Sequence, residues 1–137
     1  MRAVLEDDAD EAVQRALIAG MREFNAQATG GLQSHKIAAA VRGEDGALHG
    51  GVIGRLAGDS VYMEIVWNDD TVRGTGLGRE MMLLAEDRAR ALGAREAWLY
   101  TMSFQAKPFY EKLGYTQFAE LPWLGGVHKR HFMRKDL

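Results

Sequence analysis

Hydrophobic positions recur at helical spacing near the start of the chain. In the stretch "DDADEAVQRALIAGMREF", Val13, Leu17, Met21 and Phe24 fall three or four residues apart, which is the period of one face of an α-helix. Acidic residues come first, where the helix dipole favours negative charge. The pattern predicts a helix, or two helices if Gly20 divides the stretch.

The next part of the chain is typical of strands. It runs "HKIAAAVRGEDGALHGGVIGRLAGDSVYMEIVW". The pair Asp45-Gly46 is a hairpin signal, because both residues suit a tight turn between antiparallel strands. The pair Gly58-Asp59 predicts a second turn, which leads into a strand over about 60–67.

A second helical pattern covers about 77–92. One of its faces carries four apolar residues, Met82, Ala85, Ala89 and Leu92. Gly93 follows directly and suits a helix end. The stretch "AREAWLYTM" then predicts a strand.

The C-terminal part contains a short helix and two strands. The helix is "AKPFYEKLG", with Pro108 near its start and Gly114 at its end. The strands are "YTQFAEL" and "HKRHFMRK", joined by a turn at Gly125-Gly126. Antiparallel strands are thus followed by strand, helix, strand, helix and hairpin. This order predicts an α/β (α+β) fold with a mixed, mostly antiparallel central sheet flanked by helices.

The amino-acid composition excludes several classes of protein and of functional site. With 137 residues, 47% hydrophobic and 26% charged, the chain suits a single domain over 1–137. A net charge of -2 argues against nucleic acid as a partner. The lack of cysteine excludes disulfides, thiolate metal sites and a cysteine nucleophile. There is no signal peptide and no apolar run of membrane-spanning length, so we expect a cytoplasmic protein without a membrane partner.

A glycine-rich stretch, "VRGTGLGREMM", precedes the second helix. Gly74, Gly76 and Gly78 stand at alternate positions after Arg73. The first N–H groups of a helix have no internal partners, and the helix dipole attracts anions. Glycine lets a ligand approach the backbone. We predict a phosphate site here; the alternative is that the glycines only form a tight turn.

The chain lacks two common phosphate-binding motifs, because residues that each motif requires at a fixed spacing are missing. The dinucleotide fingerprint G-x-G-x-x-G needs a third glycine where this chain has Arg79. It also needs an acid after the second strand, where this chain reads "LYTMSF". The nucleotide P-loop G-x-x-x-x-G-K-[ST] does not occur in the chain.

The pattern R-x-x-G-x-G, made by Arg73, Gly76 and Gly78, resembles the acetyl-CoA signature of the GNAT superfamily, the Gcn5-related N-acetyltransferases. The blocks "IVWNDDTVRGTGLGREMM" and "SFQAKPFYEKLGY" also resemble that family's segments. The likeness is strongest from Gly50 to Tyr115, and the second block resembles a bacterial subgroup of small proteins. It implies the GNAT fold and an N-acetyltransferase with acetyl-CoA as cosubstrate.

The resemblance also implies roles for residues. Backbone N–H groups of the loop would bind the CoA pyrophosphate, and the backbone at the end of the preceding strand would pair with pantetheine. Ser103 stands where the family often has asparagine. The expected cofactor residues are Val66, Trp67, Asn68, Arg73, Gly74, Thr75, Gly76, Leu77, Gly78, Arg79 and Ser103.

The implied chemistry needs an acid and a base. Tyr110 matches the family tyrosine near the thioester sulfur, and a phenol is protonated at neutral pH. Phe109 and Leu113 share a helix face, so Tyr110 is expected to point elsewhere, unless it is an ordinary packed aromatic. The absence of cysteine rules out an acyl-cysteine intermediate and favours direct attack by the amine in a ternary complex.

Glu64 is the candidate base, since some family members use a strand glutamate there. By alternation it shares a face with Tyr62 and Val66; the alternative is a solvent-facing strand acid. We expect a small cationic amine as acceptor, because carboxylates attract cations and Trp123 offers an aromatic face.

Three further predictions concern a metal site, the C-terminal strand and the oligomeric state. His128 and His131 lie on opposite faces of a strand, so no metal site is expected. "HKRHFMRK" is either a basic patch or a solvated edge strand. An edge strand in a small domain suits a homodimer. The alternatives to an enzyme are a non-catalytic acyl-CoA-binding or regulatory module, and an interaction protein that uses Lys129 and Arg130.

Overall fold

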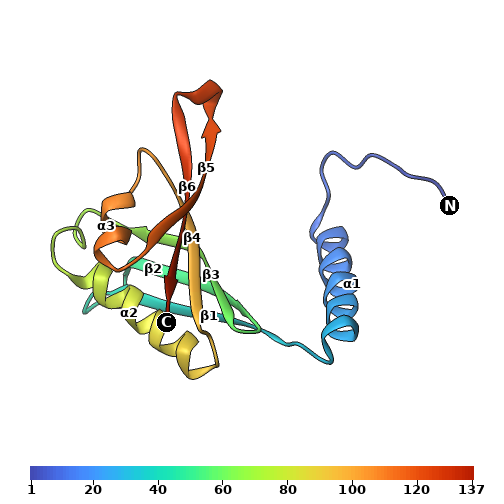
Figure 1. The fold of residues 1–137 in the computed structure, drawn as a ribbon, viewed down its shortest axis with the longest axis horizontal. Coiled ribbons are helices and arrows are strands. Elements are labelled where there is room, and N and C mark those ends of the chain that lie inside the picture. Colours follow the sequence, from blue (N-terminus) through green and yellow to red (C-terminus); the bar gives the residue numbers. More distant parts are fainter. The chain divides into compact units, whose positions relative to one another are not determined.

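The computed structural model describes all residues, Met1–Leu137, in two compact units, Met1–Gln33 and Ser34–Leu137. The first unit contains helix α1, Glu11–Thr29 (Figure 1). Asp10 caps it by accepting a hydrogen bond from Val13 N, and Gly30 ends it with a left-handed backbone, φ 72°. The predicted helix is confirmed, but the division at Gly20 is wrong. A glycine weakens a helix without breaking its hydrogen-bond ladder.

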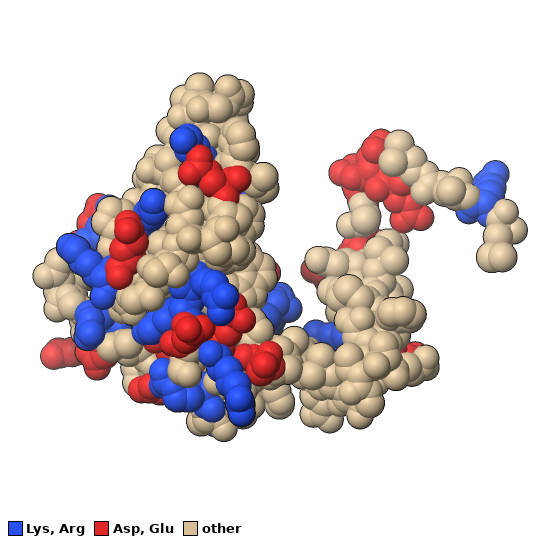
Figure 2. Space-filling view, in the orientation of Figure 1, with Lys and Arg blue, Asp and Glu red and all other residues tan.

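The apolar stripe of α1 is exposed. Leu17, Met21 and Phe24 all lie open to solvent, and no residue of the helix is buried. Acidic side chains gather just before the helix, as Figure 2 shows in red. Within the unit Met1–Gln33 the helix is therefore defined by its own period and caps, and its apolar face has no partner inside this unit.

The second unit is built on a six-stranded sheet in the order β1-β2-β3-β4-β6-β5. Only the β3–β4 pair is parallel, so the predicted mixed, mostly antiparallel sheet is confirmed. The strands are β1 Ser34–Arg42, β2 Leu48–Ala57, β3 Ser60–Asn68, β4 Glu96–Met102, β5 Thr116–Trp123 and β6 His128–Asp136.

Helix α2, Leu77–Ala91, crosses one face of this sheet over β1 and β2 (Figure 1). Its predicted inner face is confirmed, because Met82, Ala85 and Ala89 are all buried. Helix α3, Lys107–Lys112, begins beside Pro108 as predicted. None of the three α-helices has the length and apolar character needed to cross a membrane.

The last strand differs from the sequence-based expectation. A short 3₁₀ turn, η1 Leu124–Gly126, joins β5 to β6. Strand β6 pairs with β4 on one side and β5 on the other. It is therefore not a solvated edge strand, because the hairpin folds back so that its second arm enters the sheet. The tip of this hairpin carries no charged side chains on the face shown in Figure 2.

A bulge interrupts β3. Ile53 of β2 pairs with Ile65, but the next β2 residue, Gly54, pairs with Met63, so Glu64 is an extra residue. An inserted residue reverses the alternation of side chains beyond it. Val66 consequently packs against the core, whereas Tyr62 stacks on Trp98 instead. The expectation that Tyr62, Glu64 and Val66 share one face is wrong for this reason.

Candidate active site

A cavity opens where β3 and β4 separate. These parallel strands pair only at Ser60–Tyr62 with Glu96–Trp98, and both continue beyond that point. The cavity has a volume of about 1030 Å³ and is lined by the far ends of both strands, by the loop before α2, and by α3. Ligands of sheets with parallel strands commonly bind at the carboxyl ends of the strands.

The three glycines of the loop Arg73–Gly78, called the glycine loop from here on, serve two purposes. Gly74 and Gly76 have φ of 76° and 84°, a backbone conformation that other residues adopt at a cost. Gly78 has an ordinary φ, but a Cβ there would lie 2.9 Å from Asn68 Nδ2. The first two glycines shape the loop, and the third allows a close approach between α2 and β3.

The glycine loop presents free backbone donors. The N–H groups of Thr75 and Leu77 donate within the loop, to Val72 O and Thr75 Oγ1. Those of Gly74, Gly76 and Gly78 donate to no protein atom, and all three glycines line the cavity. Free N–H groups at a helix start attract phosphate. The loop therefore fits a diphosphate group.

Asn68 ends β3 and connects the loop region to β2. A Cβ on Gly50 would overlap Asn68 Oδ1. Asn68 thus fills the space left by two glycines, Gly50 on β2 and Gly78 on α2. Its buried Oδ1 has no hydrogen-bond partner within the protein. Sequence reasoning assigned a role only to the Asn68 backbone, because the contact depends on glycines distant in the chain.

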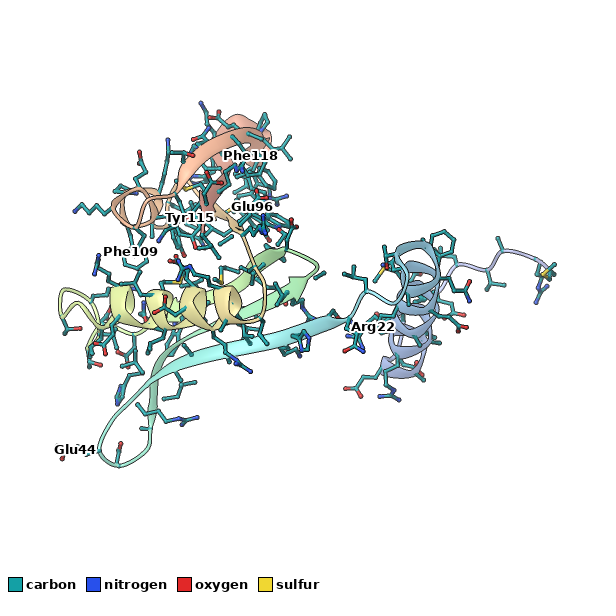
Figure 3. All side chains as sticks on the ribbon, turned by 60° about the horizontal axis from the view of Figure 1, so that its bottom comes forward. Arg22, Glu44, Glu96, Phe109, Tyr115 and Phe118 are labelled. Carbon is teal, nitrogen blue, oxygen red and sulfur yellow. The ribbon has the colours of Figure 1, made fainter.

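Tyr110 projects from α3, lines the cavity, and is only 7% exposed. Its ring makes edge contacts with Phe109 and Tyr115, at centroid distances of 5.2 and 6.0 Å; Figure 3 shows these two neighbours between α3 and α2. Burial raises the pKa of Tyr110 to about 12. The ring is therefore packed in the core while the residue faces the cavity, and the hydroxyl stays protonated.

Glu64, the bulged residue, also lines the cavity. Arg55 Nε of β2 donates a hydrogen bond to Glu64 Oε2. The carboxylate is thus oriented by a neighbouring strand and remains in contact with solvent. The structure brings Tyr110, Glu64 and the glycine loop around the same cavity.

Other expected cofactor residues are placed differently. Val66, Trp67, Asn68, Arg73 and Arg79 line the cavity, whereas Thr75, Leu77 and Ser103 do not. The Ser103 hydroxyl accepts a hydrogen bond from Lys129 N at 3.1 Å and lies 3.2 Å from His128 Nδ1. Ser103 therefore joins β4 to the start of β6.

Phe104 is a cavity residue that sequence reasoning missed. Its ring lies 4.8 Å from that of His128 and 6.0 Å from that of Trp123. The cluster of these three rings connects the cavity wall to the last hairpin. No group of three His, Cys, Asp or Glu side chains in the chain is placed to hold a metal ion.

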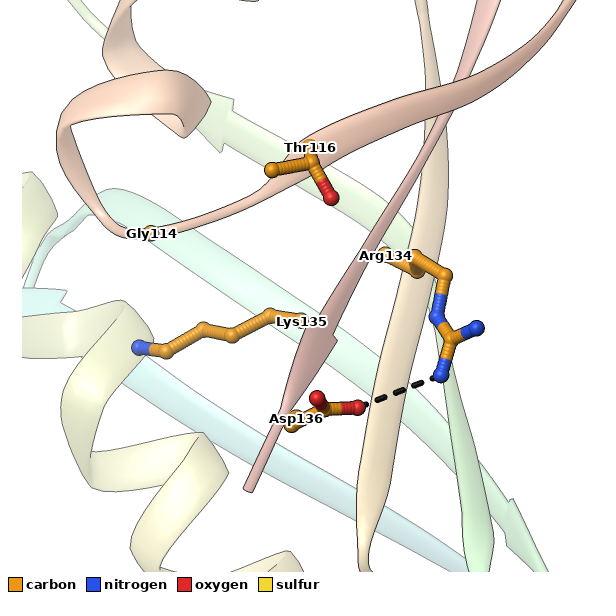
Figure 4. A pocket seen from close by; sticks show the side chains of 5 residues that line it. All are labelled: Gly114, Thr116, Arg134, Lys135 and Asp136. Carbon is orange, nitrogen blue, oxygen red and sulfur yellow. Dashed lines mark hydrogen bonds and ion pairs between the residues drawn. The ribbon is translucent and has the colours of Figure 1, made fainter.

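A second, smaller cavity of about 300 Å³ lies near the C-terminus (Figure 4). Its charged side chains are already paired. Arg134 contacts Asp136 at 3.1 Å, and Lys135 contacts Glu86 at 2.6 Å. The larger cavity between β3 and β4 also holds the glycine loop, Tyr110 and Glu64, so it is the candidate active site.

The sheet thus opens between two parallel strands, and a loop that fits a diphosphate and a tyrosine lie at the opening; this arrangement suits an acyl-CoA-dependent transferase. Residues 1–115 match the Acetyltransferase (GNAT) family. The chain belongs to this family and is an N-acetyltransferase that uses acetyl-CoA as donor.

Named relatives agree with this assignment. Acetyltransferase Atu2258 of Agrobacterium fabrum is 27% identical over 88% of each chain. Blasticidin-S acetyltransferase of Streptomyces morookaense is 34% identical over 69% of this chain and 71% of the relative. A crystal structure from Agrobacterium tumefaciens, assigned as an acetyltransferase, covers 100% of both chains with 26% identity and a TM-score of 0.90. The sequence-based recognition of the family and its fold is confirmed.

Proposed function

We propose that this enzyme transfers the acetyl group of acetyl-CoA to the primary amine of a small cationic acceptor, by direct attack in a ternary complex. The observation that carries the proposal is the shared cavity. The glycine loop, the free edge of β3, Tyr110 and Glu64 all line one space of about 1030 Å³. Because both substrates bind in the same cavity, the acetyl group can pass directly from acetyl-CoA to the amine.

The cofactor follows the opening between the strands. Its diphosphate binds the N–H groups of Gly74, Gly76 and Gly78, which no protein acceptor uses. Its pantetheine arm lies along Val66–Asn68, where β4 no longer pairs with β3. Unpaired strand edges bind extended chains by backbone hydrogen bonds. This arrangement directs the thioester toward Tyr110.

Proton transfer is divided between two residues. The acceptor ammonium, with a pKa near ~10.4, must lose a proton before it attacks, and Glu64 is the base. The amine nitrogen then bonds to the thioester carbon, the carbon–sulfur bond breaks, and the second proton of the nitrogen passes through solvent to the departing sulfur, so that the products are the amide and the CoA thiol. The Tyr110 hydroxyl donates a hydrogen bond to that sulfur.

The raised pKa of Tyr110 limits its role. A phenol with a pKa of about 12 holds its proton more tightly than a thiol with a pKa near ~8.5. Complete transfer to the thiolate is therefore uphill. Tyr110 acts chiefly as a hydrogen-bond donor, which stabilises negative charge as it develops on sulfur.

Several features favour a cationic acceptor. Glu64 places a carboxylate on the cavity wall, and Phe104 adds an aromatic face, which suits a cation. The nearby cations on β6 are already engaged. Lys129 pairs with Glu120 at 3.0 Å, and the Arg130 guanidinium lies 5.1 Å from the centre of the Tyr100 ring. They therefore repel an incoming ammonium less than the sequence suggests.

A screen of amine acceptors tests the proposal by measuring the release of free CoA thiol. The panel contains diamines, basic amino acids and blasticidin S, the acceptor named for the 34% identical relative. Neutral arylamines and a reaction without acceptor serve as controls. We expect release with a cationic primary amine. Tight acetyl-CoA binding without turnover of any amine would instead support the non-catalytic module.

A further inference from the structure

Asp69 lies between the end of β3 and the glycine loop, and its carboxylate forms hydrogen bonds with several neighbouring groups. It accepts hydrogen bonds from Thr71 N at 2.9 Å and Val72 N at 3.3 Å, and from the Thr71 hydroxyl. His49 Nδ1 of β2 lies 2.8 Å from the other carboxylate oxygen. Because a carboxylate only accepts, that nitrogen carries the proton.

The backbone of Asp69 makes two more bonds. Its N–H donates to His49 O at 2.8 Å, and its carbonyl accepts from Val72 N at 3.2 Å. Asp69 therefore fixes the direction of the chain where it leaves the sheet. Val72, the residue it holds, is buried and is only 3% exposed.

A series of hydrogen bonds continues from Val72 to the helix start. Thr75 N donates to Val72 O at 3.2 Å, and the Thr75 hydroxyl donates to the same carbonyl. Leu77 N, the first residue of α2, donates to Thr75 Oγ1 at 3.2 Å. The orientation of the glycine N–H groups between these points depends on the bonds at Asp69.

We infer that Asp69 is a positioning residue for acetyl-CoA binding, anchored by His49 and acting through the hydrogen bonds that lead to the glycine loop. The inference rests on the proposed cofactor site. Asp69 is not among the residues that line the cavity, so it acts on the cofactor through the backbone of the loop.

The charge of Asp69 makes the inference testable, because an electrostatic effect and a positioning effect would change the affinity for acetyl-CoA in opposite directions. Hydrogen bonds from Thr71 and His49 lower the pKa of Asp69 to about 2, so it is anionic at neutral pH. A carboxylate near a diphosphate site repels the ligand. If charge alone mattered, removal of Asp69 would tighten acetyl-CoA binding. If Asp69 positions the loop, removal weakens it.

The neighbouring carboxylate provides a matched control. Asp70 is one residue away, highly exposed, and pairs only with the exposed Arg73, at 2.6 Å. Asp70→Ala and Asp69→Ala remove the same charge from the same turn. Only Asp69→Ala also removes the hydrogen bonds to Thr71, Val72 and His49.

Calorimetric titration with acetyl-CoA measures the effect, with circular dichroism as a check on folding. We expect Asp69→Ala to raise Kd by about tenfold or more, because bonds to a charged acceptor are lost. Asp69→Asn should fall between it and wild type, since its amide oxygen still accepts from Thr71 N. Asp70→Ala should bind as tightly as wild type or more tightly.

Steady-state kinetics separate positioning from general damage. The KM for acetyl-CoA should rise in Asp69→Ala, while kcat at saturating acetyl-CoA and the KM of the acceptor are retained. Thr71→Val, which removes one hydroxyl, should give a smaller loss in the same direction. A folded Asp69→Ala that binds as well as Asp70→Ala would overturn the inference but leave the cofactor site standing. Absence of binding by wild type would instead reject the proposed site itself.

Discussion

The Tyr115 hydroxyl donates a 2.9 Å hydrogen bond to Glu86 Oε1, and that glutamate is only 1% exposed. Lys135 Nζ of β6 lies 2.6 Å from the other oxygen of the same carboxylate. A charge is buried only where it is paired and hydrogen-bonded. These contacts join α2 to the segment after α3 and to the last strand. They therefore hold Tyr115, against which the Tyr110 ring packs.

Tyr115→Phe should destabilise the fold without affecting chemistry. The change removes only the hydroxyl, and a bond to a charged acceptor is worth about 1.5–3 kcal/mol. We expect a loss of this size in the free energy of unfolding, measured by urea titration. The acetyl-CoA KM should stay near the wild-type value. A loss below roughly 0.5 kcal/mol, typical of a surface change, would show that the Glu86 charge is satisfied without Tyr115.

Tyr110→Phe tests the donor to sulfur. The ring and its packing are retained, so acetyl-CoA binding should be nearly unchanged. Loss of a group that stabilises developing charge or donates a proton costs about 10²–10⁴ in rate, and we expect kcat to fall by that order. Turnover within about threefold of wild type would assign Tyr110 to packing alone.

The pH dependence of kcat follows from the raised pKa of Tyr110. A tyrosine with an ordinary pKa of 10.0 would lose its proton near pH 10 and give a falling limb there. With a pKa of about 12, Tyr110 stays protonated through that range. We expect the rate to rise with pH as the acceptor deprotonates and to show no fall below about pH 11. A falling limb near pH 10, absent in Tyr110→Phe, would contradict this.

Glu64→Gln distinguishes a base from an attractor of cations. If Glu64 is the base, as proposed, the variant loses rate most at low pH, where few acceptor molecules are neutral, and recovers partly as pH rises. If it only attracts the cation, the KM of the acceptor rises, kcat is retained, and added salt weakens the effect. Wild-type kinetics across pH and salt would leave Glu64 as an ordinary strand residue.

The exposed stripe of α1 bears on assembly. Leu17, Met21 and Phe24 are large apolar residues with no partner inside the unit Met1–Gln33, and uncovered apolar stripes commonly mark protein contacts. We predict a homodimer, as expected for a small domain with an edge strand, and this stripe is one surface that the assembly can bury. Light scattering after size exclusion should give twice the mass of the 15.2 kDa chain, and Leu17→Glu combined with Phe24→Glu should give the single mass. A monomeric wild type would contradict the prediction.

The sequence predicts local features of this protein well. The start of α2 within the glycine-rich stretch, the hairpin at Asp45-Gly46 and the inner face of α2 all follow from short-range patterns. The face of Glu64 does not, because the bulge depends on how β3 pairs with β2. The fit of Asn68 against Gly50 likewise joins residues from different strands, and no local pattern reveals it. That the whole chain folds as a single domain stays a prediction.

Acetyl-CoA binding at the glycine loop is the central claim, and a pair of substitutions at Gly76 tests it. Gly76 has φ 84° and open space around a Cβ, and both Asn and Asp tolerate that conformation better than other residues. Gly76→Asn and Gly76→Asp are equal in size and differ by one negative charge beside the diphosphate.

The deciding measurement is calorimetric titration of acetyl-CoA into these two variants and wild type, each first shown to be folded. We expect wild type to bind, Gly76→Asn to bind more weakly, and Gly76→Asp to show no detectable binding because like charges repel. Melting curves should agree, since a ligand at ~100 times its Kd adds about 2.7 kcal/mol of stability. Equal affinity of the Asp and Asn variants would contradict the account and place the cofactor away from this loop.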